Sequence, residues 1–125
     1  MSAQSILIFN LEEAVRDSLH FILSEEGYRC FSTSSRSEAI ELLQQETISM
    51  VIMDSELPDL TTALKAFQET SPCVKIILIS SYADTEVTQQ ALSRGADDFV
   101  LKPLDFDELI SCVKKLFLSP SDKQH

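Results

Sequence analysis

The sequence lacks the features of a membrane or secreted protein. No apolar run approaches the ~18 residues that a membrane-spanning helix needs. The first basic residue is Arg16, so the chain also lacks the positively charged start of a secretory signal. We therefore expect no membrane partner and a cytoplasmic location.

Cysteine is scarce as well, with three in 125 residues. Cys30, Cys73 and Cys112 are widely spaced and match neither a metal-binding nor a disulfide pattern. Each lies in or beside an apolar segment, so we expect thiols that pack in the core or at its edge.

Basic residues are few: the chain has 10 of them against 20 acidic residues, and its net charge is −10. A domain with this charge repels phosphate backbones, so we predict that it does not bind nucleic acid directly. The carboxylates suit basic partners or metal ions without identifying either. Most of them are expected to be solvated surface groups.

The length and composition fit a single globular domain. Of the 125 residues, 44% are hydrophobic, which is enough for one core. The chain shows neither an internal repeat nor an internal linker. We place the domain at residues 1–118 and assign residues 119–125 to a C-terminal tail or linker stub.

Short apolar segments alternate with helical patterns. The segments expected to form strands are residues 6–9, 28–31, 50–53, 74–79 and 98–101. Five alternations with short connections predict parallel strands, right-handed crossovers and helices on both faces of the sheet. The expected fold is α/β: a flavodoxin-like, doubly wound, five-stranded parallel sheet in the order 2-1-3-4-5, with five helices.

Local signals agree with this pattern. The chain's two glycines, Gly27 and Gly95, each separate a helical pattern from a strand, where a helix end needs a left-handed backbone. Ser35 and Asp105 are each followed three residues later by Glu, as in a capping box.

Asp54 directly follows the apolar segment 50–53. In open α/β sheets, ligands and chemistry collect in the crevice beyond the carboxyl ends of the strands. A carboxylate at this position is well placed to react. Taken alone, however, an aspartate in a turn or at a helix N-cap is an equally good interpretation.

Three motifs, taken together and in this order, resemble a two-component response-regulator receiver domain. The resemblance runs from about residue 6 to residue 118, nearly the whole chain. Each motif alone is weak, but their joint spacing within one α/β domain is a strong signal. The motifs are Val51-Ile52-Met53-Asp54-Ser55-Glu56-Leu57-Pro58, Ile77-Leu78-Ile79-Ser80-Ser81-Tyr82 and Gly95-Ala96-Asp97-Asp98-Phe99-Val100-Leu101-Lys102-Pro103.

The resemblance implies a role for four side chains. Asp54 matches the carboxylate that accepts a phosphoryl group, and Lys102 matches the basic residue that pairs with the acceptor and then with a phosphoryl oxygen. Ser80 matches the switch hydroxyl that hydrogen-bonds the phosphoryl group. Phe99 matches the aromatic side chain that follows this hydroxyl inward. The peptide between Lys102 and Pro103 resembles one that is cis in this family.

The resemblance also implies partners and excludes an enzyme. The phosphoryl donor would be a sensor histidine kinase or a phosphotransfer protein. The output would pass to an effector domain or protein through the face formed by the fourth helix, the fifth strand and the fifth helix. The domain itself would be a signalling switch.

The sequence departs from the family after the first strand. Where the family places two adjacent acidic residues that hold Mg²⁺, this chain has Asn10 and Leu11. Mg²⁺ requires oxygen ligands, and Leu11 offers none. We expect at most a weak Mg²⁺ site, whose candidate ligands are Asp54, the side-chain carbonyl of Asn10, the backbone carbonyl of Glu56 and, less favoured, Glu12.

Two further expectations follow. Without a cation, the Asp54 carboxylate needs another partner, so we predict a direct ion pair with Lys102. The family also has a glycine four residues after the proline of the third-strand motif, whereas this chain reads Asp59-Leu60-Thr61-Thr62-Ala63 after Pro58. The shape of this loop and the start of the next helix are therefore left open.

Three functions remain as interpretations. The first, which we favour, is a switch that accepts a phosphoryl group on Asp54 with an impaired Mg²⁺ site. The alternative is a pseudo-receiver, an interaction module whose output does not depend on phosphorylation. An enzyme or flavin-binding protein of the same fold is disfavoured, because Glu12 and Glu13 would repel a cofactor phosphate, and Glu56 stands where an aspartate-nucleophile phosphatase needs a second aspartate.

Overall fold

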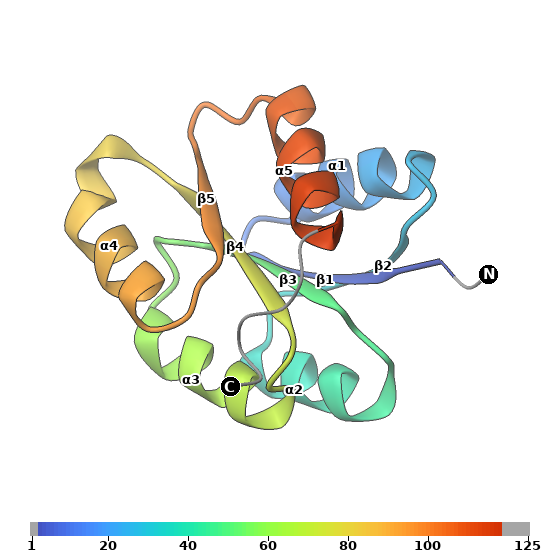
Figure 1. The fold of residues 1–125 in the computed structure, drawn as a ribbon, viewed down its shortest axis with the longest axis horizontal. Helices are drawn as coiled ribbons and strands as arrows, with labels where there is room; N and C mark the ends of the chain where they lie inside the picture. Colours follow the sequence, from blue (N-terminus) through green and yellow to red (C-terminus); the bar gives the residue numbers. More distant parts are fainter. Residues whose placement is uncertain (1–2, 119–125) are drawn as a thin grey trace.

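The computed structural model describes residues 3–118, within which five strands alternate with five α-helices (Figure 1). A short 3₁₀ helix, η1, precedes the fourth α-helix. The elements are β1 Ser5–Phe9, α1 Glu13–Glu25, β2 Arg29–Thr33, α2 Arg36–Gln45, β3 Met50–Asp54, α3 Leu60–Thr70, β4 Lys75–Ser80, η1 Tyr82–Asp84, α4 Thr85–Ser93, β5 Asp98–Leu101 and α5 Phe106–Leu118.

The sheet has the predicted topology. Its strands are all parallel and lie in the order β2-β1-β3-β4-β5. Helices α1 and α5 cover one face, and α2, α3 and α4 cover the other (Figure 1). The flavodoxin-like doubly wound fold is therefore confirmed.

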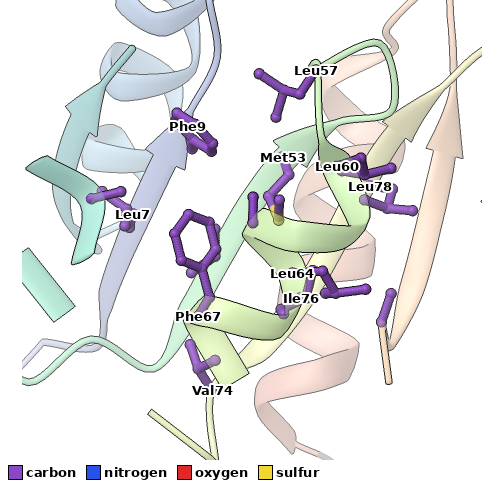
Figure 2. Packing of buried hydrophobic residues seen from close by; sticks show 14 of the residues in the cluster. Leu7, Phe9, Met53, Leu57, Leu60, Leu64, Phe67, Val74, Ile76 and Leu78 are labelled. Carbon is purple, nitrogen blue, oxygen red and sulfur yellow. The ribbon is translucent and has the colours of Figure 1, made fainter. Parts of the chain in front are cut away.

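Both faces of the central strands are buried, which explains why these segments are continuously apolar. Alternate residues of β1 and its neighbours point into one of two clusters. In the cluster under α2, α3 and α4, Phe9 packs edge-on against Phe67 with ring centroids 5.5 Å apart (Figure 2). The second cluster, under α1 and α5, includes Ile8 and Ile52.

Most element boundaries fall within one or two residues of the predicted ones. Strand β2 runs two residues further than expected, to Thr33, and β4 is shifted by one residue to end at Ser80. The fifth helix ends at Leu118, and the tail assigned to residues 119–125 lies outside the described residues. Within residues 3–118, no helix is long and apolar enough to span a membrane.

One expectation about the cysteines is wrong. Cys112 is buried and Cys30 is half-buried, as predicted, but Cys73 is exposed. It lies in the short turn between α3 and β4, where the chain crosses the surface. An apolar neighbour such as Val74 does not bury a residue that belongs to the turn.

The loop after Pro58 closes without a glycine. Helix α3 begins at Leu60, and Asp59 before it has a left-handed backbone with φ of 55°. Aspartate is one of the residues that tolerates this conformation. Leu57 and Leu60 are buried in the core on either side of the turn, so the apolar contacts hold the loop in place.

The predicted glycine and cap positions are confirmed. Gly27 and Gly95 have φ values of 95° and 110°. Gly95 also lies so close to Gln68 that a Cβ atom would collide with its side-chain amide. The Ser35 hydroxyl accepts a hydrogen bond from the Glu38 backbone N–H, and Asp105 caps α5 in the same way.

Phe67 and Phe21 provide a matched test of the core. Phe67 is fully buried under the sheet, whereas Phe21 is exposed on α1. We expect Phe67→Ala to lower the free energy of unfolding by about 3–5 kcal/mol and Phe21→Ala to change it by less than about 0.5 kcal/mol. Urea unfolding of both variants measures the difference. Equal losses would contradict the assigned packing of α3.

Candidate functional site

The predicted site residues come together at the carboxyl edge of the sheet. Parallel strands end at the same edge, and backbone hydrogen bonds continue past the strand ends. The Ser55 N–H donates to the Ile79 carbonyl at 2.9 Å, and the Lys102 N–H donates to the Ser80 carbonyl at 2.7 Å. These bonds place the residues after β3, β4 and β5 side by side. The Lys102–Pro103 peptide is cis, as the resemblance implied.

An ion pair between Asp54 and Lys102 occupies the centre of this edge. The Lys102 Nζ lies 3.0 Å from Asp54 Oδ2 and 3.2 Å from Oδ1. The same ammonium contacts Glu56 Oε2 at 3.1 Å. Asp54 is only 7% exposed, so its carboxylate needs such a partner. The predicted pairing is confirmed, and Glu56 takes part through its side chain.

The two carboxylates alter the acidity of Lys102. Burial by itself lowers the pKa of Lys102, but its hydrogen bonds to Asp54 and Glu56 and their charges outweigh that effect and raise the pKa above its ordinary value of 10.5. The ammonium is therefore fully charged near neutral pH. The stabilisation from this pairing is complete below the pKa of the unfolded chain and is lost as the pH rises through the higher folded-state pKa.

Asn10 is also part of this network, but not in the orientation that we expected. It is buried, and its side-chain N–H group donates to Asp54 Oδ2 at 3.4 Å. Its side-chain carbonyl accepts a hydrogen bond of 2.9 Å from the Glu12 backbone N–H. The amide therefore presents hydrogen atoms, not an oxygen, to Asp54. Its predicted use as a metal ligand would require the amide to turn its carbonyl toward Asp54.

The donor set around Asp54 does not fit a strong Mg²⁺ site. A hollow of about 220 Å³ beside Asp54 is lined by Asn10, Leu11, Glu12, Glu56 and Leu57. Leu11 is 54% exposed and brings only an apolar side chain. Within the part of the chain that the structure describes, no three Asp, Glu, His or Cys side chains converge in a way that could hold a metal ion. Mg²⁺ demands near-octahedral oxygen ligands, which these residues do not supply together.

Ser80 and Phe99, the predicted switch residues, lie beside a second hollow. The Ser80 hydroxyl makes a hydrogen bond with the hydroxyl of Thr88 on α4, and its other contact is the Ser81 carbonyl at 3.4 Å. It does not contact Asp54. The Phe99 ring is 38% exposed and borders the hollow of about 360 Å³ between α4 and β5. In this structure neither side chain is turned toward the acceptor.

Several polar residues near the site were not anticipated. The Asp84 carboxylate accepts hydrogen bonds from the hydroxyls of Ser55 at 2.8 Å and Ser81 at 3.2 Å, which joins the loops after β3 and β4. Arg16 on α1 donates to the Asn10 backbone carbonyl at 2.7 Å. The serines adjoin Asp54 and Ser80 in sequence, which was an available signal. Thr88 and Arg16 reach the site from helices, and no spacing pattern singled them out.

Comparison with known proteins agrees with this arrangement. Residues 6–114 match the family model described as the response regulator receiver domain. The chain belongs to this family.

Relatives and solved structures of receiver domains support the assignment. The sporulation initiation phosphotransferase F of Bacillus subtilis is 26% identical over 92% of this chain and 94% of the relative. The TorCAD operon transcriptional regulatory protein TorR of Escherichia coli is 33% identical over 89% of this chain and 49% of the relative. A CheY-like receiver domain protein of Methanospirillum hungatei has a TM-score of 0.83 at 29% identity, covering 92% of this chain and 94% of that one.

The relatives differ in length. This receiver domain spans nearly all of the Bacillus protein but only 25% of the NtrX-like response regulators of Rickettsia. Receiver domains are signalling modules, they serve two-component systems, and they typically bind Mg²⁺ at the phosphorylation site.

Replacing Glu56 tests the shared ion pair. We expect Glu56→Gln to lower the pKa of Lys102, because one of its two carboxylate partners loses its charge. NMR titration of the Lys102 side chain measures the midpoint, and Lys115, which pairs with Asp98 on another part of the surface, serves as an internal control. An unchanged Lys102 midpoint would show that Glu56 does not hold this ammonium.

Proposed function

We propose that this receiver domain accepts a phosphoryl group on Asp54 from a histidine kinase or a phosphotransfer protein, and that its Mg²⁺ site is impaired. An oxygen of the Asp54 carboxylate attacks phosphorus, and the bond from phosphorus to the donor histidine nitrogen breaks. Lys102 then pairs with a phosphoryl oxygen. The domain takes up one group per cycle and is a switch, not an enzyme.

The observation that carries this proposal is the contact between Asp54 and Lys102. Asp54 lines the hollow bordered by Leu11 and Glu12, and the Lys102 ammonium lies where negative charge would accumulate on transfer. Both side chains come from strand ends that the sheet fixes in place. Such preorganised charge supports a phosphoryl-accepting site.

The same geometry supports weak Mg²⁺ binding. A pair of unit charges at about 4 Å is worth ~4 kcal/mol at an effective dielectric constant near 20, and a carboxylate facing a dication gains roughly twice that before desolvation. Asn10 and Leu11 remove two such carboxylates. The candidate ligands that remain are Asp54, Glu12, the Glu56 backbone carbonyl and a reoriented Asn10.

The alternative is a pseudo-receiver, and one observation favours it. The polar groups around Asp54 already satisfy each other, because Lys102 bridges two carboxylates and the Asn10 amide uses both its ends. A site that is complete without metal or phosphate can serve as a fixed structural element. The domain would then act only through its surface.

The partner surface that we propose is the face of α4, β5 and α5. It carries the exposed apolar side chains of Val87 on α4 and Phe99 on β5, and Tyr82 of η1 borders the same hollow as Phe99. Several relatives are named as regulatory proteins, which suits an effector domain or protein as the partner. With a net charge of −10, the domain itself would not contact nucleic acid. We place its action in the cytoplasm, where these kinases deliver their phosphoryl groups.

The test of the proposal is to restore the missing carboxylates. The double variant Asn10→Asp, Leu11→Asp should bind Mg²⁺ at least tenfold more tightly than wild type and react faster with acetyl phosphate, because two hard oxygen ligands then face Asp54. Calorimetry gives the affinity, and intact mass gives the phosphorylated fraction. Asp54→Asn, which lacks the nucleophile, should gain no phosphoryl group.

Two results would overturn parts of this proposal. If wild type binds Mg²⁺ and reacts as strongly as the double variant, the site is not impaired, and Glu12 or Asn10 supplies the ligands. If the double variant folds and binds Mg²⁺ but takes up no phosphoryl group, the pseudo-receiver is the better description. Circular dichroism of each variant separates these results from misfolding.

A further inference from the structure

The Ser80 hydroxyl is held by α4 and not by the acceptor site. Ser80 is 1% exposed at the end of β4, and Thr88, one turn into α4, is 4% exposed. Their hydroxyls are directly hydrogen-bonded, and either can be the donor. Both residues are buried, so this bond supplies a partner that water does not, and the Ser80 hydroxyl has one further, longer contact with the Ser81 carbonyl at 3.4 Å.

This pairing opposes any use of Ser80 at Asp54. To reach a phosphoryl group, the Ser80 hydroxyl must rotate away from Thr88 and give up their hydrogen bond. A buried hydroxyl that loses its partner carries a free-energy cost. The two arrangements of Ser80 therefore compete, and the hydroxyl of Thr88 favours the one seen here.

The position of Thr88 is fixed by the segment before α4. Asp84, the last residue of η1, accepts hydrogen bonds from the side chains of Ser55 and Ser81. Its backbone N–H donates to the Ser81 carbonyl at 3.0 Å. The start of α4 is thus tied to the loops after β3 and β4. A movement of α4 that took Thr88 away from Ser80 and carried Asp84 with it would also break these contacts.

We propose that Thr88 is a positioning residue that holds the Ser80 hydroxyl away from Asp54 and so limits the reactivity of the acceptor. The expected effect on the phosphorylation rate rests on the proposed phosphoryl-accepting function. The position of the Ser80 hydroxyl is independent of that function. Phosphorylation would then have to break the contact between Ser80 and Thr88, which links chemistry at Asp54 to the attachment of α4.

Two substitutions at Thr88 separate the hydroxyl from the shape of the side chain. Thr88→Val keeps the branched shape and removes the hydroxyl, whereas Thr88→Ser keeps the hydroxyl. In the unphosphorylated protein, three-bond NMR couplings report the Ser80 side-chain rotamer. We expect Thr88→Val to shift or average this rotamer and Thr88→Ser to retain that of wild type. An unchanged rotamer in a folded Thr88→Val protein would overturn the proposal.

The rate of reaction with acetyl phosphate provides the second measurement. Thr88→Val should react roughly fivefold faster than wild type, the change that one hydrogen bond of ordinary net strength produces. Thr70→Val is the matched control, because the Thr70 hydroxyl bonds to the Ala66 carbonyl within α3, away from the site, and its loss should leave the rate unchanged.

The same substitutions in a Ser80→Ala background identify the route of the effect. If Thr88 acts through Ser80, Thr88→Val should give no increase when Ser80 is absent. If Thr88→Val still raises the reaction rate in the Ser80→Ala background, the proposal is overturned, because Thr88 would then act without Ser80. If no variant, wild type included, takes up a phosphoryl group while the rotamer still shifts in Thr88→Val, the proposed function fails and the positioning role of Thr88 stands.

Discussion

The charge pair between Asp54 and Lys102 is the contact on which the site depends. A carboxylate that is 7% exposed at the end of a buried strand is costly without a partner, and Lys102 Nζ supplies one at 3.0 Å. Lys102 arrives there because β5 is in register with β4 and its backbone bonds to Ser80. That register follows from the parallel pairing of β5 with β4. The pairing of the strands therefore determines which charges meet at the site.

The residues at positions 10 and 11 suit the charge balance around Asp54. Asp54, Glu56 and Lys102 together carry one net negative charge. Two more carboxylates at Asn10 and Leu11 would bring the total to three negative charges, which a divalent cation would have to offset. With an amide at position 10 and an apolar side chain at position 11, the Lys102 ammonium and the Asn10 N–H group offset part of the negative charge on Asp54 and Glu56. In the structure, hydrogen bonds from within the protein therefore surround the Asp54 carboxylate.

Much of this arrangement could be predicted from the sequence, because it follows from periodicity and strand order. Five apolar segments between helical patterns predicted the sheet, and motif positions predicted that Lys102 would meet Asp54. Partners on helices could not be predicted: Thr88 reaches Ser80 only because of how α4 is rotated and tied down, and no spacing encodes that. The orientation of the Asn10 amide was also missed, because it is decided by one backbone N–H of Glu12. Asp59 could adopt the left-handed turn without glycine, a tolerance that leaves no clear sequence signal.

Ser80 connects the acceptor site with α4 through two different groups. Its backbone carbonyl accepts the Lys102 N–H, while its hydroxyl bonds to Thr88, so one residue joins the charge pair to α4. Phosphorylation of Asp54 would give Lys102 a phosphoryl oxygen to pair with. It would also give the Ser80 hydroxyl a new hydrogen-bond acceptor. In the proposed switch, such a change would also alter the hydrogen bond between Ser80 and Thr88 of α4, whose neighbouring hollow is bordered by Phe99. Because these connections are hydrogen bonds within the protein, they do not depend on the strength with which Mg²⁺ binds. The proposed route from Asp54 to α4 therefore runs through residues of the chain itself.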